Sequence, residues 1–311
     1  MPFVFLLNGS KLMNYFSVFL SSLPGACAQG LAWGIMALGV YLTFRILNTS
    51  DLTVDGSLAT GGAMCIALMT AGVNTGLAIL AATVCGMLAG LITGLLHTKC
   101  GIPAILAGIL TQLSLYSLNL RIMGNRANLP ISVDRFKLLV SQRYVRNLNF
   151  KNPIPVFVII IAVIIAVLYW FFGTEIGSSI RATGNNVHMA KAQGVNTDTN
   201  KVLGLSLANG LVALSGSLIA QYQGAADVNM GRGAIVIGLA AVIISEVLFG
   251  RIFKNFSLKM LAVVLGAVIY YIVLQLVLTL GLNTNDLKLF SALIVAIFLA
   301  IPYFKGGKKD A

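Results

Sequence analysis

Few residues of this sequence combine the type and the spacing that catalysis or metal binding requires. His97 and His188 each lack a second metal ligand four positions away, and no G-x-x-x-x-G-K-[ST] phosphate-binding loop occurs. The cysteines also lack metal-ligand spacing, and most lie in apolar stretches where we expect them to pack: Cys27, Cys65, Cys85 and Cys100. We therefore expect that the chain is not an enzyme and holds no metal or cofactor of its own.

Glu246 is the one acidic residue deep within an apolar stretch. It lies about one helical turn from Arg251, near the end of that stretch, where a charge costs less than the roughly 2.5–3.5 kcal/mol of the bilayer centre. We expect Glu246 to be paired or hydrogen-bonded at the inner mouth of the protein rather than to relay protons.

The composition explains why such residues are scarce. Apolar residues make up 58% of the 311 residues and charged residues 10%, whereas soluble domains average roughly 45–50% and 25%. The net charge of +12 comes from basic residues in short segments between apolar stretches. No basic helix is interleaved with aromatic residues, which argues against nucleic-acid binding. The sequence predicts a polytopic membrane protein of the all-α class.

A membrane-spanning helix needs about 20 mainly apolar residues. Seven stretches are strongly apolar: 24–44, 75–96, 103–121, 153–173, 199–221, 256–280 and 287–303. Two are weaker, rich in glycine, and begin beside an acidic residue: 52–71 and 233–250. Residues 1–22 are expected to form an N-terminal interfacial helix or an extra span. The chain is thus predicted to be one transmembrane domain, residues 1–311, with about 8–10 transmembrane helices. Small residues every four positions predict close packing of the span 75–96 against another helix: Gly86, Gly90 and Gly94.

Basic residues predict which ends of the spans face the cytoplasm. Arg45, Lys99, the cluster 251–259 and the C-terminal lysines mark four inner segments, and with residues 174–198 also inside, every span from residue 24 onward alternates. Residues 122–152 must then form an extracytoplasmic loop, although their own positive charge argues for the inside. We accept the outer position because the four other segments agree. Within this loop, residues 133–148 have the pattern of an amphipathic helix on the outer surface.

Several polar residues interrupt the apolar stretches. Gln112, Tyr116 and Asn119 follow helical spacing and share one face. Three more lie in other spans: Asn209, Tyr271 and Gln275. In hydrocarbon such groups need partners within the protein, so we expect them to point into the bundle. Two explanations remain open, namely hydrogen bonds between helices and the lining of a polar pathway.

The two weaker spans resemble each other. Asp51-Leu-Thr-Val opens the first, and Asp227-Val-Asn-Met opens the second; at the same offset, Gly62 corresponds to Gly238. The two spans run in opposite directions, and each follows one strong span and precedes two others. This pattern predicts an inverted repeat with two discontinuous helices, whose ends are marked by Asp51, Asp55 and Asp227. The alternative is that acidic residues commonly begin helices and that glycine is common in spans.

A polar segment, residues 174–198, separates two strongly apolar spans. Residues 175–183 are expected to form a short helix that ends at Gly184 in a left-handed conformation. Asn186 is a favourable N-cap for a second short helix over residues 187–193, which Gly194 ends. Together the two helices would form a compact elbow that protrudes into the cytoplasm. Such an elbow suits docking in a groove of another protein.

The residues of the elbow carry a resemblance to a known family. The pattern Gly177-x3-Arg181-Ala182-x-Gly184-x-Asn186-x3-Ala190-x3-Gly194 resembles the coupling helix of permeases from ATP-binding-cassette importers. The subgroup includes the branched-chain amino acid and ribose permeases, and DLTVDGS at 51–57 resembles its early motif. Residues 102–124 are most similar to the branch with tryptophan/tyrosine-type permeases. The resemblance extends from Met13 to Tyr303.

This resemblance implies partners and roles. The chain would form a homodimer in the bacterial cytoplasmic membrane, with two cytoplasmic ATPase subunits that hold ATP and Mg²⁺. An extracytoplasmic binding protein would deliver a small solute, an aromatic or branched-chain amino acid. The elbow residues quoted above would contact the ATPase, and the six polar span residues would line the pathway. The outer loop would receive the binding protein through Arg126, Arg135, Arg143 and Arg146.

Two other transporters fit part of the same pattern. A secondary transporter driven by an ion gradient would also show an inverted repeat, and an importer of this type could carry a sugar or a nucleoside. A membrane enzyme is the third class, and the sequence lacks the convergent acid, base or metal ligands that it would need.

Overall fold

The strongly apolar stretches fold as helices long enough to cross a membrane. The computed structural model describes residues 9–133, 135–145, 152–250 and 252–279, together with residues 289, 292–293 and 295–296. In this part of the chain six helical segments have the length and composition of spans: Ser17–Ile46, Thr75–Thr98, Ala104–Ile122, Pro153–Gly173, Thr197–Gln223 and Phe256–Thr279. They confirm six of the seven strong spans, and the seventh, 287–303, lies mostly outside the described residues.

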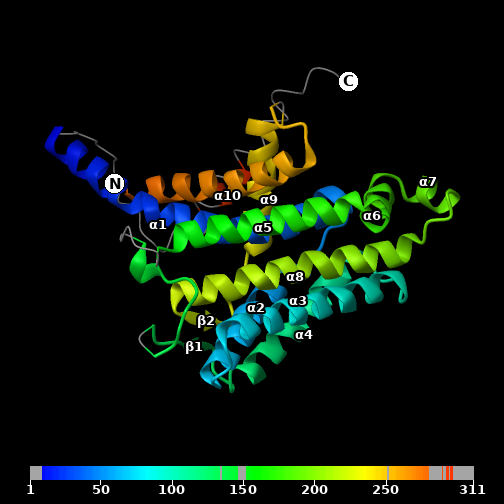
Figure 1. The fold of residues 1–311 in the computed structure, drawn as a ribbon, viewed down its shortest axis with the longest axis horizontal. Coiled ribbons are helices and arrows are strands. Elements are labelled where there is room, and N and C mark those ends of the chain that lie inside the picture. The colour runs from blue at the N-terminus through cyan, green and yellow to red at the C-terminus, as the bar shows by residue number, and fades with distance from the viewer. Residues whose placement is uncertain are drawn as a thin grey trace.

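The elements follow one another along the chain as Figure 1 shows. The α-helices are α1 (Gly9–Tyr41), α2 (Thr53–Thr70), α3 (Thr75–Thr98), α4 (Ala104–Ile122), α5 (Pro153–Gly173), α6 (Glu175–Asn185), α7 (Val187–Ala192), α8 (Thr197–Gln223), α9 (Ala234–Phe249) and α10 (Phe256–Thr279). A π-helical turn, η1 (Leu42–Ile46), and a 3₁₀ turn, η2 (Gln142–Tyr144), are also present. Two short strands, β1 (Asn128–Pro130) and β2 (Ala225–Asp227), pair antiparallel. The all-α class is confirmed.

The N-terminal segment belongs to the first span. Helix α1 runs without a break from Gly9 to Tyr41, with Pro24 inside it. Residues 9–22 are therefore continuous with the helix of the first span. A proline within a membrane helix is tolerated because neighbouring groups satisfy the backbone it frees. At its other end α1 continues into η1, a widened turn of the kind that often marks functional positions.

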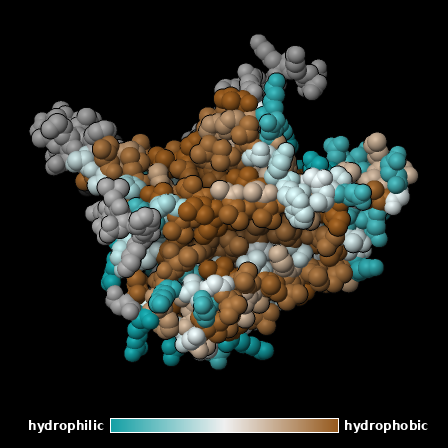
Figure 2. Space-filling view, in the orientation of Figure 1, coloured by the Kyte–Doolittle hydropathy of each residue, from teal (hydrophilic) through white to brown (hydrophobic). Residues whose placement is uncertain are grey.

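The bundle has two distinct ends. In Figure 1 the elbow helices α6 and α7 lie at one end with the turn between α3 and α4, and β1 and β2 lie at the opposite end. Turn η1 packs on α6, so Arg45 and Lys99 both belong to the elbow end, as the charge pattern predicted. Figure 2 shows apolar side chains over the middle of the visible face and hydrophilic ones gathered around α6 and α7. The basic loop lies at the end opposite to the elbow.

The prediction of an amphipathic helix over residues 133–148 is wrong for the residues that are described there. Apart from η2 this stretch is irregular. Its backbone is held by distant groups: Leu139 N donates to Gln221 Oε1 at 3.0 Å, and Thr75 Oγ1 donates to the Lys137 carbonyl at 2.6 Å. These tertiary hydrogen bonds satisfy backbone groups that a helix would have paired locally.

Glycine faces allow the closest helix contacts. A side chain on Gly86, Gly90 or Gly94 of α3 would overlap residues of α8. This confirms the packing predicted from their spacing. Helix α1 uses Gly30 and Gly34 in the same way against α10.

Candidate functional site

Capping side chains define the elbow. Thr174 Oγ1 accepts a hydrogen bond from Gly177 N at 3.3 Å and caps α6, and Asn186 Oδ1 accepts from Met189 N at 3.1 Å and caps α7. Asn196 Oδ1 accepts from Thr199 N at 3.1 Å and caps α8. Beyond α7 the chain turns at Gly194, whose φ is +79°. The predicted N-cap at Asn186 and the left-handed turn at Gly194 are confirmed.

Gly184 has a different role from the predicted left-handed helix end. It lies within α6, which continues to Asn185. A Cβ at this position would overlap the Ile46 carbonyl oxygen, and one on Gly177 would overlap the Phe171 carbonyl oxygen. The two glycines therefore let the α6 backbone touch η1 on one side and the end of α5 on the other.

Side chains add further attachments between the elbow and the bundle. Asn200 Nδ2, on α8, donates to Ser179 Oγ at 2.8 Å and to Thr183 Oγ1 at 3.0 Å. Ile180 is fully buried. The Arg181 guanidinium lies over the Phe256 ring of α10, 5.7 Å from its centre, in cation–π contact. The elbow is thus attached to η1, α8 and α10 together.

The elbow keeps an outward face. Met189 is 64% exposed and Ile176 is 53% exposed, although both are large and apolar. Of the residues predicted to contact an ATPase, four are also exposed: Arg181, Ala182, Asn186 and Gly194. The other three are buried or half-buried: Gly177, Ala190 and Gly184. Ile176 is a contact candidate that sequence reasoning missed, because its neighbours gave it no apolar pattern.

Equivalent turns precede the two discontinuous helices. Asp51 Oδ1 accepts from Thr53 N at 2.9 Å before α2, and Asp227 Oδ1 accepts from Asn229 N at 2.7 Å before α9. Asp51 also contacts Asn209, which follows the first residue of α8 by 12 positions (209 − 197), or about 18 Å of helix. Helix α2 therefore starts well inside the bundle rather than at its surface.

The two helix starts meet. Both carboxylate oxygens of Asp55, in the first turn of α2, accept backbone hydrogen bonds from the start of α9: Gly233 N at 2.9 Å and Ile235 N at 3.0 Å. A Cβ on Gly231 would overlap the Asp55 carbonyl oxygen. Residues 55 and 231 correspond in the sequence repeat, since 51 + 176 = 227 and 55 + 176 = 231. Contact between equivalent positions is expected where a pseudo-two-fold axis passes.

Helix packing follows the same symmetry. Helix α1 packs along α10 as α8 packs along α3, and α2 packs on α3 as α9 packs on α10. Helix α2 leads toward Thr75, which bonds the outer loop, whereas α9 ends beside Arg45 at the elbow end. The two helices thus run in opposite directions, which confirms the predicted inverted repeat.

A buried polar cluster ties the first discontinuous helix to its neighbours. Asn209 Nδ2 donates to Asp51 Oδ2 at 2.6 Å, and Ser57 Oγ donates to Asn209 Oδ1 at 2.6 Å. Threonine hydroxyls extend the contacts from α2 to α3 and α4: Thr53 to Thr93 at 2.7 Å and Thr93 to Thr111 at 2.9 Å. All members of this cluster are buried. Of these residues, only Asp51 and Asn209 stand out in the sequence.

Comparison with known proteins places this architecture in a family. Residues 23–302 match the family described as branched-chain amino acid transport system / permease component. The chain belongs to this family. The tyrosine transport system permease protein of Clostridioides difficile (strain R20291) is 38% identical over 281 residues, which cover 90% of this chain and 91% of the relative. The chain is therefore a multi-pass membrane permease of the ATP-binding-cassette type.

Two further proteins are similar to the permease. The uncharacterized protein RP368 of Rickettsia prowazekii (strain Madrid E) is 33% identical over 277 residues, or 88% of this chain and 95% of the relative. The solved structure of PsaBC from Streptococcus pneumoniae in complex with a Fab has a TM-score of 0.54 and 17% identity, and covers 93% of this chain and 95% of that chain. At this identity the solved structure shows a shared fold alone.

The polar residues predicted to line a pathway fall into separate environments in the permease. On α4, which packs on α2 and α3, Gln112 lies against Gly56, Tyr116 is 41% exposed, and Asn119 is buried. Asn209 is enclosed in the polar cluster. On α10, which packs on α1, α5 and α9, Tyr271 is buried against Trp33. The six side chains do not form one strip within the chain.

Gln275 borders a cavity at the end opposite to the elbow. The cavity has a volume of about 310 Å³, and its polar wall includes Gln29, Gln142, Arg143, Tyr222 and Gln275. Arg143 comes from the basic outer loop, where Arg126 and Arg135 are also exposed. Arg146 lies outside the described residues. Three of the four predicted docking arginines are thus on the surface at this end.

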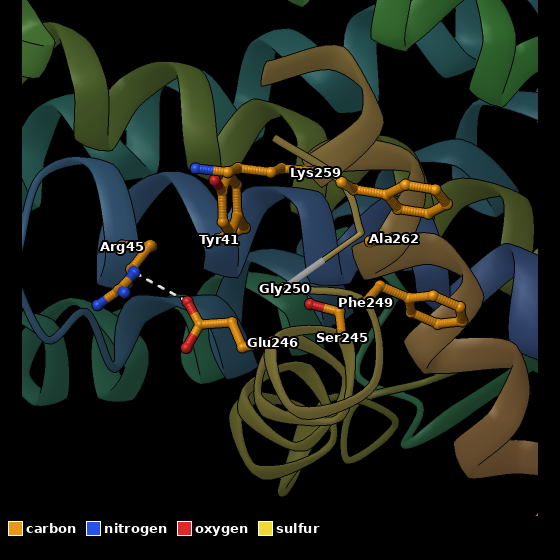
Figure 3. Close-up of a pocket in the computed structure, with 9 residues that line it drawn as sticks. Tyr41, Arg45, Ser245, Glu246, Phe249, Gly250, Lys259 and Ala262 are labelled. Atoms are coloured by element: carbon orange, nitrogen blue, oxygen red, sulfur yellow. Dashed lines mark ion pairs between the residues drawn. The ribbon is translucent and has the colours of Figure 1, made fainter. Parts of the chain in front are cut away.

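A second polar cavity lies at the elbow end of the permease. Arg45 Nε and Glu246 Oε1 form an ion pair at 2.8 Å in its wall, which confirms that Glu246 is paired. Figure 3 shows this pair, contributed by η1 and α9, with Tyr41, Ser245, Phe249 and Lys259 around it. The pair joins α9 to the turn on which the elbow packs.

Proposed function

We propose that the permease is the membrane-spanning subunit of an ATP-driven importer for an amino acid, either aromatic or branched-chain. The observation that carries the proposal is the attachment of the elbow, where α6 lies backbone to backbone against η1 at Gly184 and Ile46. A segment held this tightly moves as one body with the spans. Its outward apolar residues, Met189 and Ile176, offer an apolar contact surface to a partner.

The partner that binds the elbow is a separate ATPase subunit. The 311-residue sequence contains no phosphate-binding loop, so ATP and Mg²⁺ belong to that partner. Closure of two ATPase subunits on ATP would push the elbows of two permease copies. Because the elbow contacts η1, α8 and α10, the push reaches both halves of the inverted repeat. The assembly works in the bacterial cytoplasmic membrane.

An extracytoplasmic binding protein delivers the substrate at the opposite end. The exposed arginines there, Arg126, Arg135 and Arg143, suit acidic residues on such a protein. The adjoining cavity receives the released amino acid, and its amides and hydroxyls offer hydrogen bonds beside the charged side chain of Arg143. Gln275 keeps its proposed place on the pathway for this reason.

The amino-acid substrate is supported by the relative from Clostridioides difficile, which is named as a tyrosine transport system permease and matches over nearly the full length of both chains. An aromatic amino acid is accordingly the first substrate to test.

Reconstituted uptake tests the proposal. The permease, its co-expressed ATPase and its binding protein are placed in proteoliposomes, and uptake of labelled tyrosine, phenylalanine, leucine, ribose and uridine is measured. We expect ATP-dependent uptake of an amino acid that requires the binding protein. Uptake driven by a sodium or proton gradient without ATP would identify a secondary transporter instead, and ATP-driven uptake of only ribose or uridine would remove the amino-acid assignment.

A further inference from the structure

The cavity at the elbow end is walled by parts that the transport cycle must move. It has a volume of about 270 Å³ and is bounded by η1, α9, the segment after α9, and α10. Six of its wall residues matter here: Tyr41, Arg45, Glu246, Phe249, Phe253 and Lys259. No role described above uses the space between them.

The charges of this wall match both ends of a zwitterion. The contact between Arg45 and Glu246 uses one guanidinium nitrogen and one carboxylate oxygen, whereas an arginine has five N–H donors and a carboxylate has two oxygens. The two side chains remain 61% and 43% exposed. Lys259 adds a second cation. One anion and two cations thus face a single space.

An apolar surface completes the site. The rings of Phe249 and Phe253 stack with their centres 5.4 Å apart and their planes 7° apart. In Figure 3 the Phe249 ring lies on the side of the pocket away from Arg45. Stacked rings favour an aromatic or other flat apolar group in contact with them.

We propose that this cavity binds the imported amino acid from the cytoplasmic side and that its occupation slows further import. The inference rests on the proposed function. The ligand is a free amino acid with an aromatic side chain: its ammonium group faces Glu246, its carboxylate faces Lys259 and Arg45, and its ring lies against Phe249 and Phe253.

The position of the cavity links occupation to transport. A neighbouring groove of about 510 Å³ shares Tyr41, Arg45 and Lys259 with it, and that groove is also lined by Arg181 and Gly184 of the elbow. A ligand that touches η1, α9 and α10 at once favours the arrangement in which these three elements are close. It therefore opposes any step of the cycle that separates them.

Vesicle loading tests the regulatory part. Initial uptake of labelled tyrosine is compared between proteoliposomes that are empty and those preloaded with about 1 mM unlabelled tyrosine, which half-saturates a site whose Kd is about 1 mM. We expect preloading to lower wild-type uptake by about half and to have little effect on Lys259→Gln or Glu246→Gln. The readout is the ratio of the two rates, so a change in basal rate cancels. An unchanged ratio in the wild type would overturn the inference.

Direct binding tests the site without transport. Tyrosine is titrated into the permease and its ATPase in nanodiscs, without the binding protein. Two analogues are titrated in parallel: tyramine, which lacks the carboxylate, and N-acetyltyrosine, which lacks the ammonium charge. We expect tyrosine to bind more tightly than either analogue, and Lys259→Gln to weaken it about tenfold. Lys259→Arg should restore binding, and Lys254→Gln, an exposed lysine outside the cavity wall, should leave it unchanged.

Binding that is absent, or equal for tyrosine and both analogues, would overturn the site. Binding that Lys254→Gln weakens as much as Lys259→Gln would do so as well. If no ATP-dependent uptake of any amino acid is found, the proposed function fails, and the nanodisc titration still decides whether the site exists.

Discussion

Replacing Asn209 by leucine should destabilise the permease more than the average point substitution, which costs about 1 kcal/mol. Asn209 donates to the buried carboxylate of Asp51 at 2.6 Å and accepts from Ser57 at 2.6 Å. Without Asn209, the second oxygen of Asp51 loses its donor, and Thr53 N on the other oxygen remains. Leucine fills the space but offers no hydrogen bond.

The size of the effect follows from these contacts. A hydrogen bond to a charged group contributes about 1.5–3 kcal/mol, and a neutral one about 0.5–1.5 kcal/mol. Together they predict a loss of about 2–4.5 kcal/mol in the free energy of unfolding of Asn209→Leu. The double variant Asp51→Leu with Asn209→Leu should cost less than the sum of the two single changes, because both partners are then removed together.

Asn119→Leu is the matched control. Asn119 is as buried as Asn209, but within the described residues neither atom of its amide has a hydrogen-bond partner. Removal of an unsatisfied buried amide should be neutral or stabilising. Unfolding is followed by circular dichroism in mixed micelles of dodecyl maltoside and sodium dodecyl sulfate. Equal free energies for Asn209→Leu and Asn119→Leu would refute the argument from the polar cluster.

Four further predictions concern the elbow and the two ends. Gly184→Val should uncouple ATP hydrolysis from uptake, because the valine side chain would overlap Ile46. Gly173→Ala is the control, because the space around Gly173 is open. Equal coupling ratios (substrate taken up per ATP hydrolysed) in the two variants would contradict this prediction. Arg181→Glu should lower the coupling ratio as well, because it removes the cation–π contact with Phe256, and a normal ratio in this variant would remove Arg181 from the relay. Replacing Arg126, Arg135 and Arg143 by glutamine should weaken docking of the binding protein by about 0–1 kcal/mol per ion pair, and the effect should be smaller at high salt. Docking is measured by surface plasmon resonance, and docking that does not depend on salt would argue against these three arginines. A membrane-impermeant maleimide should label the exposed native Cys100 from the cytoplasmic side alone, and labelling from outside would reverse the orientation.

Apolar length and local repeats predicted most of the architecture. The strong spans follow from apolar runs alone, and the two discontinuous helices follow from the echo of Asp51 in Asp227. Each of these features is visible in the sequence as a local pattern, either an apolar run or a short motif that occurs twice. The capping roles of Asn186 and Gly194 are local in the same sense, and both are as predicted.

The features that the sequence did not predict all depend on contacts with distant residues. Gly184 serves contact with Ile46, 138 positions away (184 − 46), so its local pattern misleads. Residues 133–145 prefer a helix by pattern, but hydrogen bonds to α3 and α8 hold them irregular. Thr93 was not recognised as part of a cluster because membrane threonines commonly bond their own helix, as Thr93 also does with Ala89. A single sequence does not show which of these hydroxyls has a second partner.

The carboxylate of Asp55 occupies an anion site that the fold would otherwise leave at the centre of the permease. The bare N-terminus of a discontinuous helix is a ready site for an anionic group. Here the start of α9 is already occupied by the protein's own carboxylate, through Gly233 N and Ile235 N. These two donors are therefore not open to a second carboxylate, although the start of a discontinuous helix would otherwise attract one.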